Sequence, residues 1–332
     1  MSLRDSGARR RLPMRPTGWR IGPLHASAGL GITSRHLLGT NMASDNLRGA
    51  FWMVAAMAGF AVEDGFLKGA SARLPLGEVR VLLGVFGMLV FAALAWRAGE
   101  AAFPAAFLSR TMAVRSGFEV IGRLFYALAI ALTPISVASA ILQASPLVVV
   151  LGAAVVFGER VGWQRWLVIG LGFVGVLVIL RPGLAGFDAL SLLALAGLIG
   201  FAGRDLATRA APPAVSNAQL GVAGFAMLGL SGAIILGFSG GAMVPTGPVW
   251  AQVGGASVFG ICGYGALTTA MRTGEVAAVT PFRYSRLLFA MVLGVLVFGE
   301  RPDAATLAGS AIIVACGLVI LTQHRRIGAG AA

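Results

Sequence analysis

The sequence predicts an all-α integral membrane protein with ten transmembrane helices arranged as two inverted five-helix repeats. Three observations carry that prediction. First, the 332 residues are 57% hydrophobic and only 12% charged, whereas about a quarter of the residues in an average soluble domain are charged. Second, apolar runs long enough to cross a bilayer recur along the chain. Third, two motifs that contain charged residues recur at one fixed spacing. This composition excludes an ordinary soluble enzyme, a disordered protein and a disulfide-stapled secreted domain.

The expected helices follow from the apolar runs, because a hydrocarbon core about 30 Å thick needs roughly 20 helical residues per crossing. The first repeat has runs at residues 49–67, 76–96, 116–133, 135–157 and 163–180, and the second at 188–206, 217–238, 250–270, 276–298 and 303–322. Short loops join most of these runs. The stretch between Arg97 and Arg115 is long enough to lie along the membrane interface.

The distribution of basic residues predicts the orientation, because Arg and Lys concentrate in cytoplasmic loops. With the N-terminus inside, the inner loops and C-tail hold Arg97, Arg110, Arg115, Arg160, Arg165, Arg204, Arg209, Arg272, Arg325 and Arg326, against Lys68, Arg73, Arg80, Arg181 and Arg301 outside. Both termini are therefore predicted to be cytoplasmic. Lys68 is the only lysine, and this bias toward Arg is typical of a GC-rich bacterial genome. The expected location is therefore a bacterial inner membrane.

The ends of the chain are predicted to be tails. Residues 1–46 form a basic N-terminal tail, and residues 324–332 form a short C-terminal tail. Three interpretations of the first tail stay open. Translation starts at Met42, the tail is a disordered segment near anionic lipid, or it is an Arg-rich transit peptide.

An internal repeat divides the rest of the chain into residues 47–183 and 184–323. The motif FGER occurs at 157–160 and again at 298–301, a shift of 141 residues, and the same shift aligns GFAVED at 59–64 with GFAGRD at 200–205. Because each repeat holds an odd number of helices, the second copy enters the membrane from the opposite side. Inverted repeats of this kind are typical of secondary transporters, which bind substrate near the midplane.

These residues carry a resemblance to a known family. The phrase ASAILQASPLVVVLGAAVVFGERVGWQRW at 138–166 resembles the end of an EamA-type domain, and VTPFRYSRLLFAMVLGVLVFGERPDAATLAG at 279–309 resembles a second copy in which Leu287 replaces a proline. Across residues 47–322 the chain is thus similar to the drug/metabolite transporter superfamily. The resemblance implies ten helices, a central cavity, and transport of small metabolites without ATP. The missing second proline argues against a symmetric gate.

Charged and polar side chains at membrane depth are the candidate functional residues, because burying them in lipid is costly. The candidates for substrate binding are Arg123, Gln143, Tyr264, Arg283, Tyr284 and Arg286, and those for proton coupling are Glu119 and Asp64, with Glu63, the neighbour of Asp64, as its alternative. Arg groups suit carboxylate or phosphate. The alternatives are a structural Glu119–Arg123 ion pair, arginines that snorkel to the headgroups, and helix-end salt bridges from Asp64 to Lys68 and from Asp205 to Arg209.

Three further positions have expected roles. Tyr264 falls opposite Arg123 at the 141-residue shift, which favours a place in the cavity. Glu159 follows a glycine at a helix end and is expected to be a structural loop cap. Gly197, Gly200 and Gly203 form one stripe of a helix and are expected to pack closely against another.

These residues favour a secondary transporter, proton-coupled or facilitative, for a small organic metabolite that is anionic or zwitterionic. The three histidines lie in the tails, and the sequence contains no GK[ST] motif, so no catalytic residue, metal site or cofactor is predicted and an ATP pump is excluded. The expected partners are the substrate and the lipid bilayer, without nucleic acid, and a homodimer stays open. The alternative function is a non-transporting membrane sensor or structural protein.

Overall fold

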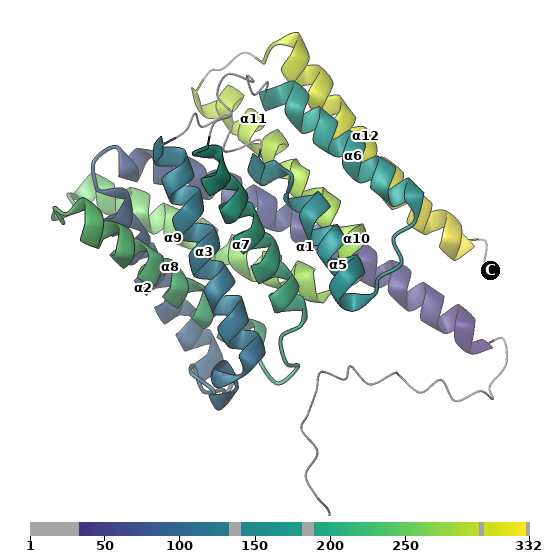
Figure 1. Ribbon diagram of the computed structural model, residues 1–332, viewed down its shortest axis with the longest axis horizontal. Helices are drawn as coiled ribbons and strands as arrows, with labels where there is room; N and C mark the ends of the chain where they lie inside the picture. The colour runs from purple at the N-terminus through teal and green to yellow at the C-terminus, as the bar shows by residue number, and fades with distance from the viewer. Residues whose placement is uncertain (1–32, 133–140, 181–188, 299–301, 330–332) are drawn as a thin grey trace, which may run out of the picture.

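The described part of the chain is entirely helical. The structure is a computed structural model that describes residues 33–132, 141–180, 189–298 and 302–329. Its helices are α1 (Thr33–Ser71), α2 (Leu76–Arg97), η1 (Ala105–Leu108), α3 (Arg110–Leu132), α5 (Ser145–Phe157), α6 (Trp163–Leu180), α7 (Ser191–Arg209), α8 (Asn217–Ser239), α9 (Gly247–Arg272), α10 (Val276–Val279), η3 (Thr280–Tyr284), α11 (Ser285–Phe298) and α12 (Ala304–Ala329). They pack side by side as a bundle (Figure 1).

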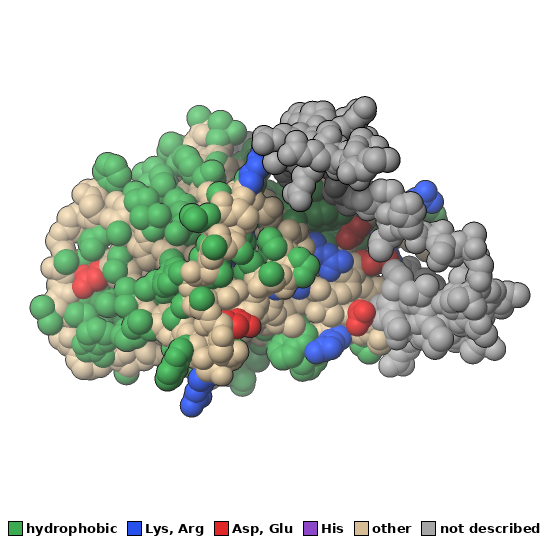
Figure 2. All heavy atoms as spheres, turned by 90° about the horizontal axis from the view of Figure 1, so that it is seen from below, with side chains coloured by type: hydrophobic (Ala, Val, Ile, Leu, Met, Phe, Trp, Pro, Cys, Tyr) green, Lys and Arg blue, Asp and Glu red, His purple; other side chains and the backbone are tan. Residues whose placement is uncertain are grey.

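Five stretches in the described ranges are long and apolar enough to cross a membrane. They are Ser44–Ser71, Leu76–Arg97, Asn217–Ser239, Gly247–Arg272 and Val276–Leu296. Shorter apolar helices lie at Ile141–Phe157, Trp163–Ile179 and Ala304–Val319. Helices α3 and α7 are in neither set, and they carry the buried charges described below. Hydrophobic side chains cover much of the surface in the view of Figure 2, as expected for a protein surrounded by lipid.

Several helices differ from the sequence-based expectation. Helix α12 continues to Ala329, so residues 324–329, which were expected in the C-terminal tail, are helical. Helix α1 begins at Thr33, so residues 33–46, which were expected in the tail, are helical; residues 1–32 lie outside the described ranges. The predicted continuous helix at 276–298 is divided into α10, the 3-10 turn η3 and α11. Pro281 lies within η3 and cannot donate a backbone hydrogen bond, which explains the tighter turn at this point.

The largest interfaces join α1 with α9, α2 with α8, α3 with α7, and α6 with α12. Glycines allow the closest approaches. A Cβ atom placed on Gly200 of α7 would lie 2.3 Å from the backbone nitrogen of Gly122 on α3, and one placed on Gly59 of α1 would lie 3.1 Å from the Cα of Gly263 on α9. Small residues serve this purpose where lipid provides no hydrophobic drive for helix association.

Glu159 of the FGER motif in the first repeat contacts the start of α10 in the second repeat. The Glu159 carboxylate accepts the backbone N–H groups of Val276 and Ala277, both at 3.4 Å, at the start of α10. Nearby, Arg165 pairs with Glu275 at 2.6 Å, and the Asn46 side chain accepts the Glu275 N–H at 2.7 Å. Polar contacts therefore close the end of the bundle at which α10 begins.

Candidate functional site

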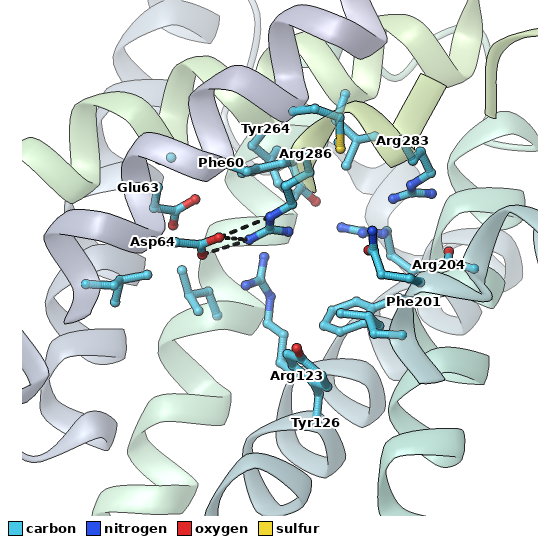
Figure 3. Close-up of a pocket in the computed structure, with 18 of the residues that line it drawn as sticks. Phe60, Glu63, Asp64, Arg123, Tyr126, Phe201, Arg204, Tyr264, Arg283 and Arg286 are labelled. Carbon is cyan, nitrogen blue, oxygen red and sulfur yellow. Dashed lines mark hydrogen bonds and ion pairs between the residues drawn. The ribbon is translucent and has the colours of Figure 1, made fainter. Parts of the chain in front are cut away.

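A polar cavity of about 210 Å³ lies within the bundle. Helices α1, α2, α3, α7, α8 and α9 line it together with the segment before and at the start of α5 and the η3–α11 segment. Its charged and polar lining residues are Glu63, Asp64, Arg80, Arg123, Tyr126, Gln143, Ser145, Arg204, Tyr264, Arg283 and Arg286. In Figure 3, Arg123, Arg283 and Arg286 extend toward this space from different helices. In Figure 2, acidic and basic side chains gather in one recess of the surface.

A buried carboxylate organises the base of the cavity. Glu119 of α3 is fully buried, and its Oε1 pairs with Arg123 Nε at 2.9 Å and Arg204 Nη1 at 3.1 Å. Its Oε2 accepts the Tyr264 hydroxyl at 3.0 Å and lies 3.6 Å from Arg115 Nη2. Three cations around one carboxylate stabilise its ionised form, because an unpaired buried charge is very costly.

Hydrogen bonds extend this cluster between α3, α7 and α9. Arg115 is also fully buried; its Nη2 donates to the Tyr264 hydroxyl and its Nε donates to Thr208 Oγ1 at 3.0 Å. The Arg204 guanidinium lies 5.5 Å from the Phe201 ring centre and 5.8 Å from that of Tyr264, so it makes cation–π contacts as well. The base of the cavity is therefore a hydrogen-bonded cluster in which guanidinium groups outnumber carboxylates.

Two further ion pairs connect the η3–α11 segment to α1 and α7. Arg286 of α11 binds the Asp64 carboxylate of α1 through two nitrogens, at 2.6–3.1 Å (Figure 3). Arg283 of η3 pairs with Asp205 of α7, which also lies 2.7 Å from Arg204 Nε. The aspartates bind these arginines, and the expected helix-end bridge from Asp205 to Arg209 is replaced by the pairs with Arg204 and Arg283.

Exposure shows which way the cavity opens. The Asp64 and Arg286 side chains are 51% and 33% exposed, whereas Asp205 is 1% exposed and Glu119 is completely buried. Leu67, one turn beyond Asp64 on α1, also lines the cavity. The cavity therefore opens toward the end of the bundle at which α1 ends and is closed at the end at which α1 begins.

Two buried polar atoms of the cavity wall have neither an ion pair nor a hydrogen-bond partner within the described ranges. They are Gln143 Nε2 and Ser145 Oγ, which lie just before and at the start of α5, where Pro146 also lines the cavity. Buried donors are nearly always satisfied in folded proteins. Both atoms are therefore free to bind polar groups of a ligand.

The structure brings most of the predicted site residues together. Arg123, Gln143, Tyr264, Arg283, Arg286 and the proton-coupling candidate Asp64 line the cavity, and Glu119 lies beneath it. Tyr284 does not: it is 2% exposed, its ring packs on Gly172, and its hydroxyl donates to the Ile169 carbonyl at 3.3 Å. The 3-10 turn at η3 changes the direction of this side chain relative to a continuous helix, so its expected place in the site is wrong.

Other cavity residues were missed because their positions near predicted helix ends suggested loops. Arg115 and Arg204 were counted as inner-loop residues and Arg80 as an outer-loop residue, yet Arg115 and Arg204 are buried in the cluster and Arg80 lines the cavity. Arg80 donates to the Arg123 carbonyl oxygen at 2.9 Å. Without these three arginines, the inner loops and C-tail still hold more basic residues than the outer loops. The prediction of cytoplasmic termini therefore stays a prediction.

The site's chemistry is that of recognition. Among the residues that the structure describes, no group of three His, Cys, Asp or Glu side chains is placed to hold a metal ion. The charged groups instead surround an open space with guanidinium groups, two carboxylates and phenol rings. An apolar helical bundle around such a charged cavity is typical of membrane transport proteins.

Comparison with known proteins gives the family. The model of the EamA-like transporter family matches the chain twice, at residues 47–181 and 187–322. The chain therefore belongs to this family, and its relatives are transporters of the drug/metabolite superfamily. A crystal structure with 21% sequence identity superposes with a TM-score of 0.70 over 86% of this chain and 98% of the other, which shows a shared fold.

The relatives carry different molecules. A riboflavin transporter of Rhizobium johnstonii is 27% identical over 84% of this chain and 92% of its own. An S-adenosylmethionine uptake transporter of Rickettsia prowazekii is 23% identical over 84% of this chain and 94% of its own. The pseudopaline exporter CntI of Pseudomonas aeruginosa is 29% identical over 81% and 94%. These relatives include both uptake and export proteins for small molecules.

Proposed function

We propose that this chain is a secondary transporter that carries a small organic anion or zwitterion across the bacterial inner membrane by alternating access. The observation that carries this proposal is the charge of the cavity. Its wall holds Arg80, Arg123, Arg204, Arg283 and Arg286 but only two acidic residues, Glu63 and Asp64. The buried Glu119 and Asp205 offset part of this excess, and Arg115 adds to it. A carboxylate or phosphate group on the substrate would complete the balance.

The size of the cavity favours a compact substrate. In this conformation its volume of about 210 Å³ is below the roughly 300–1,000 Å³ of pockets that enclose drug-sized ligands. The unpartnered Gln143 and Ser145 groups would bind polar atoms of the substrate, and the rings of Phe60, Tyr126 and Phe201 would contact its apolar part.

The helix interfaces support alternating access. A shift of 141 residues maps α1 onto α7 and α3 onto α9, so the α1–α9 interface is the repeat equivalent of the α7–α3 interface. The glycine contacts follow the same rule, since Gly59–Gly263 maps onto Gly200–Gly122. Two halves built alike can exchange conformations at little cost, which would give one state open to each side of the membrane.

Transport by purified protein in proteoliposomes tests the proposal. Radiolabelled riboflavin, S-adenosylmethionine, amino acids and dicarboxylates are offered to vesicles with and without an imposed pH gradient. We expect flux for at least one compound. Binding without flux for every compound would contradict the proposal and favour a membrane sensor.

Arg123→Ala and Arg286→Ala test the site. Loss of a charge-assisted hydrogen bond to substrate costs about 1.5–3 kcal/mol, which corresponds to roughly a 10- to 150-fold loss of apparent affinity. We expect each variant to bind the transported compound more weakly, which would be measured as a raised KM for its flux. Arg97→Ala, an exposed arginine at the end of α2, is the matched control. Unchanged affinity in both cavity variants would contradict the assignment.

A further inference from the structure

The two repeats differ at several charged positions around the cavity, and one of these differences concerns Glu63. The 141-residue shift places Glu63 of α1 opposite Arg204 of α7, and Gly260 of α9 opposite Glu119 of α3. At the α3–α7 interface, Arg204 and Glu119 form an ion pair at 3.1 Å. At the equivalent α1–α9 interface, the corresponding neighbours are Glu63 and Gly260, and a Cβ atom on Gly260 would lie 2.8 Å from Glu63 Oε1. The carboxylate thus faces a glycine where its counterpart faces an opposite charge.

The other charged groups around Glu63 are engaged elsewhere. On its own helix, Asp64 binds Arg286 of α11. On α3, Arg123 binds Glu119, and on α2, Arg80 donates to the Arg123 carbonyl. On α9, the Tyr264 hydroxyl donates to Glu119. Glu63 forms no ion pair with any residue in the described ranges, although all of these groups except Glu119 line the same cavity.

The environment of the two halves also differs in this state. Asp64 is half exposed at the open end, whereas its repeat equivalent Asp205 is 1% exposed. Leu67 is partly exposed, whereas its equivalent Thr208 is buried. If the halves exchange conformations, the end of α1 will become as enclosed as the end of α7 is here. Glu63 will then lose its water without gaining a cation, and an ionised carboxylate in that place is very costly.

We propose that Glu63 carries the coupling proton of this transporter. A proton from water binds a carboxylate oxygen of Glu63 while the cavity is open. The neutral carboxylic acid then allows the α1 half, meaning the α1–α9 side of the bundle around the end of α1, to close. No bond other than the O–H bond forms, and the proton is released to water when the opposite half opens. This inference rests on the proposed function, because it assumes the exchange between halves. The sequence suggested this coupling role for Glu119 and for Asp64 or its neighbour Glu63, and of these three Glu119 and Asp64 have guanidinium partners.

The direction of the pH effect follows from linkage. Because the closed α1 half binds one more proton than the open half, its population rises as pH falls, by up to about tenfold per pH unit for a single proton. The open conformation described here is therefore favoured at higher pH.

Thiol labelling at the cavity mouth tests this inference without a substrate. Leu67→Cys is introduced into a Cys262→Ala, Cys316→Ala background and labelled with a maleimide at pH 8 and pH 6. The same cysteine is placed in Glu63→Gln, Glu63→Asp and Glu100→Gln backgrounds. The ratio of rates between backgrounds at one pH removes the effect of pH on the thiol itself. Glu100 is the matched control because its carboxylate accepts from Ser216, far from the cavity lining.

We expect Glu63→Gln to label several-fold more slowly than the Glu63 background at pH 8 and at nearly the same rate at pH 6. Glu63→Asp keeps a titratable carboxyl and should keep the pH dependence, and Glu100→Gln should match the parent at both values. A ratio between Glu63 and Glu63→Gln that stays constant with pH would overturn the inference. A correct labelling pattern with no flux of any compound would instead refute transport and leave the proton-binding role of Glu63 standing.

Discussion

Glu119 holds three guanidinium groups together at the base of the cavity, two of them buried, so its negative charge matters for folding. Glu119→Gln keeps the shape of the side chain but leaves Arg115, Arg123 and Arg204 without this carboxylate. Breaking a buried ion pair by removing one partner costs about 3–5 kcal/mol. We expect a loss of that order in the free energy of unfolding, measured by denaturant titration in mixed micelles.

Tyr264→Phe is the comparison for this change. It removes one hydroxyl that donates to Glu119 and accepts from Arg115, while every charge of the cluster remains. We expect a smaller loss in the free energy of unfolding, about the 1.5–3 kcal/mol of a hydrogen bond to a charged group. Equal effects of the two variants would show that the cluster's charge balance is not what stabilises the fold.

For single residues, the sequence predicted side-chain partners that are close in the chain better than partners that are distant in it. The Glu119–Arg123 pair was expected because residues four apart share a helix face, and the structure confirms it at 2.9 Å. The contacts of Glu119 with Arg204 and Tyr264 join residues far apart in the chain, and no local pattern predicts them. The repeat equivalence of Arg123 and Tyr264 was the one sequence signal that placed Tyr264 in the cavity.

Among the helices, the glycines of α7 are expected to be intolerant of even one added carbon. The Cβ atom in Gly200→Ala would lie 2.3 Å from a backbone nitrogen of α3, and backbone atoms cannot move aside without separating the helices. We expect a loss of about 1–3 kcal/mol in the free energy of unfolding, as for other overpacked interiors. Denaturant titration in mixed micelles measures it.

Gly170→Ala in α6 is the matched control, because nothing lies within 4 Å of the added atom. Alanine has the higher helix propensity, worth up to about 1 kcal/mol, so this change should be neutral or stabilising. A loss in Gly170→Ala as large as in Gly200→Ala would mean that close packing between α3 and α7 is not the reason for glycine at position 200.

Helix positions and their packing stripes could be read from the sequence, whereas breaks within helices could not. The glycine stripe of α7 was predicted to pack, and Gly197, Gly200 and Gly203 all face residues of α3. The role of Glu159 as a loop cap is confirmed by its contacts with Val276 and Ala277. The 3-10 turn at Thr280–Tyr284 was missed, because an apolar run gives its length but not its local hydrogen-bonding pattern.

At the scale of the whole molecule, one conformation makes equivalent residues of the two repeats unequal. The structure is open at the end of α1 and closed at the end of α7, although similar sequences form both ends. If the second state is the exchange of the two halves, the accessibility of each repeat pair should reverse between states. That reversal depends on neither the identity of the substrate nor the direction of its transport.

Leu67 and Thr208 form the pair best suited to test the reversal, because they are 141 residues apart and differ in exposure here. In the background without native cysteines, we expect Leu67→Cys to react quickly with a membrane-impermeant maleimide added on the periplasmic side, where α1 is predicted to end. Thr208→Cys should react slowly from either side. Glu63→Gln should reverse the order, exposing Thr208→Cys to reagent on the cytoplasmic side. If both cysteines changed in the same direction, the two halves would not exchange, and the protein would open and close at one end only.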